Sequence, residues 1–218
     1  MKIIDVVPLA IPAIKIIRFA RFCDKRGYFT EPFRSSDLAS SPLTWFLKGV
    51  EFPQTNESRS KPGTIRGLHF QWNPYMGKLV RTLSGHMIDI VLDIRKGSPS
   101  FGNVIAYEMP ANAQEAFGEW IWVPPGFAHG NAFLADTSIE YFCSGEYSPH
   151  CEAGISPLAD DIDWSLCDGR LKRILDETSR TTDLITDKDR KGLSVAAWEQ
   201  DPRSDKFVFE HLLKSAVA

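Results

Sequence analysis

The sequence has little of several features that would assign a protein to a class at once. Among its 218 residues there are only four cysteines, Cys23, Cys143, Cys151 and Cys167, and no two of them form a C-x-x-C pair. A chain of this length needs no disulfide framework and shows no closed zinc site, so we expect reduced thiols in a cytoplasmic protein. The formal net charge of −3 gives no reason to expect nucleic acid or a membrane as a partner.

A long hydrophobic run is also absent. The apolar residues in positions 1–10 are interrupted by Asp5 and Pro8, which makes a poor signal peptide and a segment too short to span a bilayer. The sequence contains no dinucleotide fingerprint, no P-loop and no G-x-S-x-G motif. What is left is a chain long enough for one substantial core, whose chemistry must come from local clusters of side chains.

What the sequence does have is a series of short strand patterns. Residues 86–95 are the clearest, because alternate positions there are apolar, namely Ile88, Ile90, Leu92 and Ile94. Similar segments, separated by turns that contain Gly or Pro, occupy residues 1–20, 51–60, 64–71, 78–83, 103–109, 120–123 and 138–147. Many short strands with regular turns predict an all-β jelly roll or sandwich.

The pattern changes near Leu166. Leu171, Ile174 and Leu175 have helical spacing, and residues 194–200 and 207–214 are typical of further short helices. We therefore expect a single domain over residues 1–218, with a jelly-roll core in 1–165 and a mainly helical tail in 166–218.

The stretch Thr64–Gln71 brings a guanidinium and an imidazole close together in one predicted strand. An arginine such as Arg66 can clamp a phosphate, and a histidine such as His69 can move a proton near neutral pH. A regular strand puts these two side chains on opposite faces. Either Gly67 permits a bulge, or the two side chains serve different pockets.

Asp89 and His129 each admit two interpretations. Asp is depleted in strands, so Asp89 in mid-strand either orients a histidine or faces solvent on a half-exposed sheet. His129 follows the corner at Pro124-Pro125-Gly126, where a histidine is more often packed than catalytic. The segment 67–71 holds a single histidine. A metal-binding jelly roll usually carries two histidines separated by one residue there, so no metal is expected.

Six motifs occur in an order that resembles one enzyme family. They are Asp-x-Arg-Gly-Tyr-Phe-x-Glu at 24–31, Gln-x-Asn-x-Ser-x-Ser at 54–60, Gly-Thr-Ile-Arg-Gly-Leu-His-Phe-Gln at 63–71, Gly-Lys-Leu-Val-Arg at 77–81, Asp-Ile-Arg-Lys-Gly-Ser-Pro-Ser-Phe-Gly at 93–102 and Pro-Gly-Phe-Ala-His-Gly at 125–130. Together they resemble the dTDP-4-dehydrorhamnose 3,5-epimerase family. The resemblance implies a cupin-type jelly roll, a homodimer, a nucleotide-linked 4-keto-6-deoxyhexose as substrate, and no cofactor.

The resemblance also implies roles for individual residues. His69 matches the general base that removes the proton beside the ketone, Tyr141 the general acid on the opposite face, and Lys78 the group that stabilises the enolate oxygen. Asp189 matches the carboxylate paired with the base, beyond a segment that is longer here than in the family. Tyr147 matches the aromatic residue that stacks on the nucleotide base. Further substrate-binding positions match Arg26, Glu31, Gln54, Asn56, Arg66, His129, Glu152 and Lys188, with the arginines on the diphosphate.

The resemblance leaves the particular reaction open. The leading hypothesis is inversion at C3 and C5, from dTDP-4-dehydro-6-deoxyglucose to dTDP-4-dehydrorhamnose, through an enolate. The alternatives are epimerisation at C3 alone, a 3,4-ketoisomerase on the same fold, and a non-catalytic sugar-nucleotide binder. Asn131 departs from the family, which commonly has an aromatic residue after His-Gly. In this view Arg66 and His69 have separate tasks, on diphosphate and sugar, so we expect them on opposite strand faces.

Overall fold

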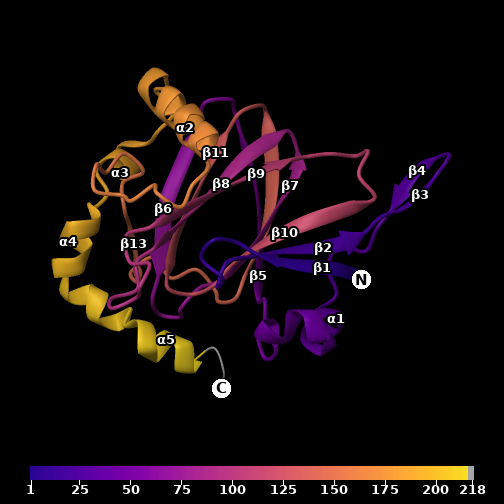
Figure 1. Ribbon diagram of the computed structural model, residues 1–218, viewed down its shortest axis with the longest axis horizontal. Helices are drawn as coiled ribbons and strands as arrows, with labels where there is room; N and C mark the ends of the chain where they lie inside the picture. The colour runs from indigo at the N-terminus through magenta and orange to yellow at the C-terminus, as the bar shows by residue number, and fades with distance from the viewer. Residues whose placement is uncertain (216–218) are drawn as a thin grey trace.

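Two antiparallel β-sheets pack face to face in the computed structural model, which describes residues 1–215 (Figure 1). The first sheet has the strand order β1-β2-β10-β7-β12-β5, and the second has the order β13-β6-β11-β8-β9. The first contains β1 (Ile3–Pro8), β2 (Lys15–Ala20), β5 (Gln54–Ser60), β7 (Lys78–Ser84), β10 (Phe117–Val123) and β12 (Thr137–Cys143). The second contains β6 (Ile65–Gln71), β8 (His86–Asp93), β9 (Val104–Pro110), β11 (Phe127–Phe133) and β13 (Glu152–Gly154). The predicted all-β jelly roll is confirmed.

The core between the sheets is formed by apolar side chains at alternate strand positions. Met87 and Val91 of β8 meet Val80 of β7 and Ile121 of β10, and all four are fully buried. The other face of β8, which includes Ile90, is buried beneath the helices. Each such side chain contributes about 1.5–3 kcal/mol through burial. Because both faces of β8 are covered, a polar residue in this strand has to find its partners inside the protein.

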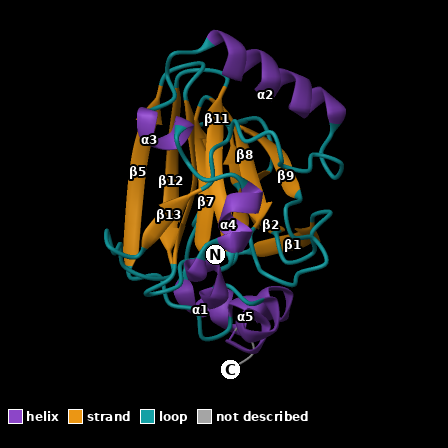
Figure 2. Cartoon of the chain, turned by 90° about the vertical axis from the view of Figure 1, so that its left-hand side faces the viewer, coloured by secondary structure: helices purple, strands orange, loops and turns teal. Residues whose placement is uncertain are grey.

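Helices cover the outer face of the second sheet (Figures 1 and 2). The longest, α2 (Gly169–Thr181), is capped by Asp168, which accepts a hydrogen bond from the backbone N–H of Arg170, and it buries Leu171 and Leu175 in the same cluster as Ile65. The others are α3 (Asp187–Arg190), α4 (Val195–Gln200), the 3₁₀ helix η2 (Pro202–Lys206) and α5 (Phe209–Ser215). The sequence therefore predicted the helical tail correctly, although its last residues, 216–218, lie outside the described part of the chain.

A two-stranded ribbon projects from the body of the molecule (Figure 1). It consists of β3 (Phe22–Asp24) and β4 (Gly27–Phe29), and its aromatic residues Phe22, Tyr28 and Phe29 are 54%, 45% and 71% exposed. Two short helices that the sequence did not predict follow it, α1 (Ser35–Ser40) and the 3₁₀ helix η1 (Pro42–Leu47). Among the described residues, the helices are all too short or too polar to cross a lipid bilayer.

Strand β6 is irregular at Gly67, and this irregularity decides which side chains face inward. His69 lies opposite His129 of β11, whereas Arg66 lies opposite Asn131, so β6 has one extra residue between the two pairs. Gly67 has φ +107°, and a Cβ there would lie 2.7 Å from backbone atoms of β11. The bulge brings Arg66 and His69 to one cavity. The expectation that they lie on opposite faces is wrong, and the bulge is the correct alternative.

Candidate active site

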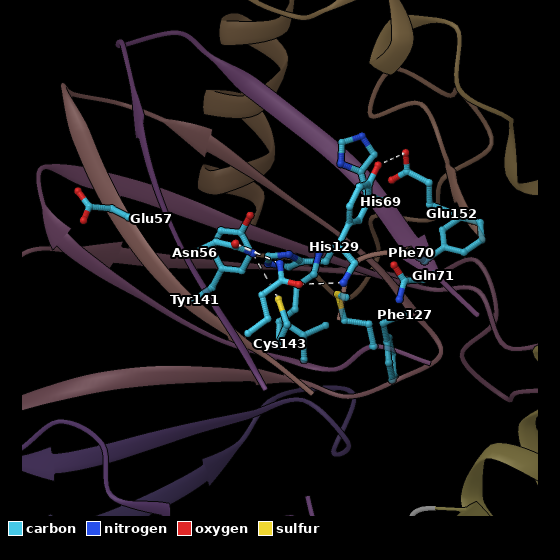
Figure 3. A pocket seen from close by; sticks show the side chains of 15 residues that line it. Asn56, Glu57, His69, Phe70, Gln71, Phe127, His129, Tyr141, Cys143 and Glu152 are labelled. Atoms are coloured by element: carbon cyan, nitrogen blue, oxygen red, sulfur yellow. Dashed lines mark hydrogen bonds between the residues drawn. The ribbon is translucent and has the colours of Figure 1, made fainter. Parts of the chain in front are cut away.

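A cavity lies between the two sheets and is lined by side chains from both (Figure 3). It has two lobes, of about 380 Å³ and about 330 Å³. Four side chains line both lobes: His69 of β6, His129 of β11, Lys78 of β7 and Tyr141 of β12. Two imidazoles from one sheet therefore meet an ammonium and a phenol from the other.

His69 is held by the carboxylate of Asp189, which belongs to α3. Its Nε2 lies 2.8 Å from Oδ1 of Asp189, and Oδ2 accepts a hydrogen bond of 3.3 Å from the backbone N–H of Gly67. The hydroxyl of Thr186 caps α3 by accepting from the N–H of Asp189. Burial alone would raise the pKa of Asp189, but the bonds from His69 and Gly67 hold it below the ordinary value. An ionised carboxylate only accepts, so Nε2 carries the hydrogen and Nδ1 keeps a free lone pair.

Lys78 and Tyr141 lie on the opposite side of the cavity from this pair. The ammonium of Lys78 lies 5.9 Å from the centre of the Tyr141 ring. Burial lowers the pKa of Lys78, and nearby acidic groups offset this only in part. Burial raises the pKa of Tyr141 and of the neighbouring thiol Cys143, which accepts a weak hydrogen bond of 3.6 Å from Asn56. The cavity therefore holds a cation beside a phenol that keeps its proton well into the alkaline range.

One carboxylate organises the mouth of the cavity. Glu152 accepts hydrogen bonds on Oε1 from the hydroxyl of Tyr147 at 3.0 Å and from the ammonium of Lys188 at 2.8 Å. The side chain of Gln54 accepts from the backbone N–H of Tyr147 at 2.8 Å. Tyr147 is 54% exposed. An exposed aromatic face beside a cation suits a ligand with a planar base next to a phosphate.

The second lobe carries further positive charge. Arg66 lines it together with Lys188 and the hydroxyls of Ser58 and Thr186. The Nε of Arg66 donates a hydrogen bond of 3.0 Å to the hydroxyl of Ser60. This bond uses one donor of the guanidinium and leaves its terminal nitrogens for a ligand.

His129 is also paired with a carboxylate. Its Nε2 lies 2.8 Å from Oδ2 of Asp89, and the same oxygen accepts a hydrogen bond of 2.9 Å from the amide of Asn131. Asp89 has no exposed surface. Of the two interpretations of Asp89, the orientation of a histidine is therefore the one that the structure has, and the solvent-facing one is excluded.

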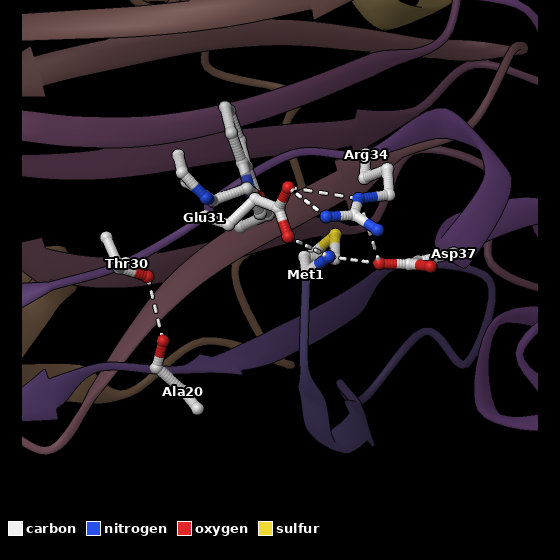
Figure 4. Close-up of polar contacts among 8 residues, drawn as sticks. Met1, Ala20, Thr30, Glu31, Arg34 and Asp37 are labelled. Carbon is white, nitrogen blue, oxygen red and sulfur yellow. Dashed lines mark hydrogen bonds and ion pairs between the residues drawn. The ribbon is translucent and has the colours of Figure 1, made fainter.

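Two of the predicted substrate-binding residues do not line the cavity. Arg26 lies in the ribbon of β3 and β4, where its 83% exposed side chain forms an ion pair of 2.7 Å with Asp24. Glu31 accepts from the ammonium of Met1 at 2.7 Å and from the guanidinium of Arg34 at 3.0 Å (Figure 4). The other predicted residues line one or both lobes, apart from Asp89, which lies behind His129.

Several residues that line the cavity were not predicted. They are Glu57, Ser58, Phe70, Gln71, Met76, Val123, Phe127, Gly130, Asn131, Ile139, Cys143 and Thr186. Some could have been found from strand parity, since Cys143 is two residues beyond Tyr141 and Ser58 is two beyond Asn56. Within the described residues, no group of three or more His, Cys, Asp and Glu side chains is placed to hold a metal ion.

The fold and the cavity together define a jelly-roll protein whose site is suited to proton transfer on a phosphate-bearing ligand. The family model of dTDP-4-dehydrorhamnose 3,5-epimerase matches residues 8–197. The chain belongs to the dTDP-4-dehydrorhamnose 3,5-epimerase family.

Relatives and a solved structure agree with this family. A dTDP-4-dehydrorhamnose 3,5-epimerase of Sinorhizobium fredii is 43% identical over 67% of this chain and 72% of the relative. One of Neisseria gonorrhoeae is 33% identical over 90% of this chain and 54% of the relative, so the chain spans about half of that protein's length. A dTDP-6-deoxy-D-glucose-3,5-epimerase of Legionella pneumophila, solved with dTDP-4-keto-L-rhamnose, has a TM-score of 0.73 at 28% identity, covering 94% of this chain and 97% of that one.

Proposed function

We propose that this protein is an isomerase that inverts C3 and C5 of a dTDP-linked 4-keto-6-deoxyhexose, from dTDP-4-dehydro-6-deoxyglucose to dTDP-4-dehydrorhamnose. The observation that carries the proposal is the pair formed by His69 and Asp189, which faces Lys78 and Tyr141 across one cavity. A base, a cation and an acid on opposite walls are what inversion beside a ketone requires.

His69 acts as the base in this proposal. Its Nδ1 takes the proton from the carbon beside the ketone, and the electron pair of the C–H bond moves to the ketone oxygen to form an enolate. Asp189 stabilises the imidazolium that results, because it is an ionised carboxylate 2.8 Å from Nε2. Lys78 stabilises the enolate oxygen only once charge develops there, so it lowers the barrier rather than tightening substrate binding.

Tyr141 acts as the acid. It lies on the sheet that faces His69, and burial raises the pKa of its hydroxyl, so it still carries its proton at neutral pH. Delivery of that proton to the other face of the planar carbon inverts the centre, and solvent then restores both groups.

The remaining lining residues bind the substrate in this proposal. Tyr147 stacks on the base, and Arg66 and Lys188 contact the diphosphate, since both cations lie at the cavity with donors to spare. The other proposed contacts, on the base, the phosphates or the sugar, come from Gln54, Asn56, His129 and Glu152.

We further propose a homodimer. The ribbon of β3 and β4 exposes three aromatic side chains, which is unusual for a surface that faces water. Arg26 lies on this ribbon, outside its own cavity and 83% exposed, so it is available to the cavity of a second copy, whereas Glu31, which follows the ribbon, is already bonded to Met1 and Arg34. A cytoplasmic location completes the proposal, supported by the four cysteines, which are free thiols.

Hydrogen exchange tests the proposed reaction. The protein is incubated with dTDP-4-keto-6-deoxyglucose in D2O, and deuterium at C3 and C5 is followed by NMR. We expect incorporation at both carbons, and we expect His69→Ala to abolish it while dTDP still binds. The control is His86→Ala, because His86 pairs with Glu108 away from the cavity.

Each alternative has its own outcome. Incorporation at C3 alone indicates a 3-epimerase. Movement of the ketone from C4 to C3 indicates a ketoisomerase. Binding with no incorporation from any nucleotide-linked 4-keto sugar contradicts an enzyme and leaves a sugar-nucleotide binder.

A further inference from the structure

The carboxylate that holds His69 belongs to a helix of a single turn. Asp189 lies in α3, which contains only four residues. Isolated helices shorter than about 12–15 residues are marginal in water, because few hydrogen bonds follow the costly first turn. The contact of 2.8 Å between Oδ1 of Asp189 and Nε2 of His69 therefore depends on the groups that fix α3 against β6.

The guanidinium of Arg190 clamps the segment that leads into α3. Its Nε donates a hydrogen bond of 3.2 Å to the carbonyl of Ile185, and its Nη2 donates one of 3.0 Å to the carbonyl of Thr182. The donors of an arginine point in fixed directions, which suits a bridge between two carbonyls. The clamped segment also contacts β6, because the N–H of Ile65 donates a hydrogen bond of 3.4 Å to the carbonyl of Leu184. Arg190 thus links α3 to the strand that carries the base.

The backbone of Arg190 is anchored on the other side, next to β13. Its carbonyl accepts a hydrogen bond of 3.1 Å from the hydroxyl of Ser156, a buried residue. Ser156 follows β13 closely, and Gly154 of that strand pairs directly with His69. Gly192 permits the close approach, since a Cβ there would lie 2.5 Å from the backbone nitrogen of Ser156. The end of α3 is therefore held from two sides through one residue.

We propose that Arg190 is a positioning residue, which holds Asp189 at the place from which its carboxylate orients His69. This inference rests on the proposed function and adds a residue on which that function depends. Arg190 lines neither lobe of the cavity, so it acts on the reaction only through Asp189. A misplacement of about 1 Å in a group that supports catalysis costs on the order of 100-fold in rate, which sets the size of the expected effect.

The cation on the same helix should be less sensitive to a small shift of α3. Lys188 has a long side chain that is 63% exposed, and its ammonium can stay with Glu152 when the helix moves slightly. The short bond between Asp189 and His69 has no such freedom. Loss of Arg190 should therefore lower kcat more than it raises KM.

The first measurement separates kcat from KM for deuterium exchange at C3. Arg190→Met removes the donors and keeps an unbranched apolar stem. We expect kcat to fall about 10–100-fold and KM to change by less than about threefold. Arg190→Lys, which offers a single ammonium for two carbonyls, should be intermediate, and it replaces Arg190→Met if thermal unfolding shows that variant to be unfolded. The control is Arg170→Met at the start of α2, because Arg170 bonds to Glu108 away from the cavity. A rise in KM at unchanged kcat would overturn the inference.

A double-variant cycle shows whether Arg190 acts through Asp189. Asp189→Asn keeps the size of the side chain and removes its charge, so exchange should be slow in this variant alone. Addition of Arg190→Met should then slow it by less than about twofold, because the effects of residues that act through one another are not additive. The same fold loss in both backgrounds would show that Arg190 only supports the fold.

The imidazole itself provides a test that needs no substrate. In protein labelled with ¹⁵N-histidine, the hydrogen on Nε2 of His69 should exchange slowly with solvent, because it is bonded to Asp189. Its resonance is assigned by its absence in His69→Ala. We expect faster exchange of this hydrogen in Arg190→Met and the wild-type rate in Arg170→Met.

The outcomes of this last measurement separate the inference from the proposed function. A wild-type exchange rate of the imidazole hydrogen in Arg190→Met overturns the positioning role. A wild type that incorporates deuterium at neither carbon of the sugar contradicts the proposed function instead, and the resonance of His69 still reports whether Arg190 holds Asp189 in place.

Discussion

At the scale of single residues, the ammonium of Lys78 is buried, and burial disfavours its charged form. Burial lowers its pKa, whereas burial raises the pKa values of Tyr141 and Cys143 beside it. The ammonium of Lys78 therefore loses its proton at a lower pH than an ordinary lysine does. The environment of this one side chain thus bears on the pH range in which the proposed reaction can proceed.

We expect the exchange rate to fall on the alkaline side below the ordinary lysine pKa of 10.5. The sign follows from the role proposed for Lys78, which would stabilise an enolate only as a cation, so activity should be present below its lowered pKa and lost above it. The measurement is the rate of C3 exchange against pH. The control variant Cys143→Ala should show the same decrease in exchange rate at alkaline pH. An exchange rate that stays constant up to the ordinary lysine pKa of 10.5 contradicts the role proposed for Lys78.

Asp93 gives a residue-scale prediction about stability. It is fully buried and accepts hydrogen bonds from Nε of Arg95 at 2.8 Å and from Nη2 at 2.6 Å, with Ser98 and Ser100 as further donors. Burial alone would raise its pKa, but these donors hold the pKa below the ordinary value. Stability from Asp93 is therefore present above pH of about 3.9 and lost as the pH falls towards the lowered pKa.

Asp93→Asn should lower the free energy of unfolding by about 3–5 kcal/mol at neutral pH, because it leaves the buried guanidinium of Arg95 without a countercharge. The measurement is urea unfolding at several pH values. The difference in the free energy of unfolding between Asp93→Asn and the wild type should become smaller at acidic pH. A difference that does not change with pH would show that the charge of Asp93 contributes nothing.

At the scale of elements, the bulge in β6 is what places both Arg66 and His69 in the cavity. Gly67→Ala should lower the free energy of unfolding for two reasons. Alanine is strained by about 1–2 kcal/mol at the positive φ of this position, and its Cβ would clash with β11 at 2.7 Å. Gly97→Ala is the matched control, since Gly97 has φ +80° but open space around it. Urea unfolding should show the larger loss for Gly67→Ala, together with slower exchange. Equal losses of stability in Gly67→Ala and Gly97→Ala would contradict the close approach of β6 to β11 at the bulge.

The same strand shows what the sequence could predict and what it could not. Alternating apolar residues gave the strands and the jelly roll, because a half-buried sheet requires that pattern. The pattern did not reveal β11, where every residue is buried and no alternation remains. The pattern also could not decide whether Gly67 forms a bulge or whether Arg66 and His69 serve different pockets, because the answer depends on the register with β11. The pairing of His69 with Asp189 came from family resemblance, because local pattern does not relate residues so far apart.

At the scale of the whole molecule, the exposed ribbon predicts self-association. Phe22→Ser combined with Phe29→Ser should convert a dimer to a monomer, because it removes two aromatic side chains that are 54% and 71% exposed. Light scattering measures the mass, and exchange should slow as Arg26 is withdrawn from a neighbouring cavity. The control is Trp45→Ser, which removes a 67% exposed aromatic residue from η1. An unchanged mass in the double variant would exclude the ribbon as the interface.

The hydrogen bond between His69 and Asp189 joins residues 120 positions apart. During translation at about 5–20 residues per second, on the order of 10 s separates the synthesis of one partner from that of the other. Within that interval β11 is synthesised and can pair with β6 on one side and with β8 on the other, while the imidazole of His69 still lacks its carboxylate. The carboxylate that orients His69 is thus among the last groups that the growing polypeptide acquires, together with the core residues Trp198 and Phe207 that follow it.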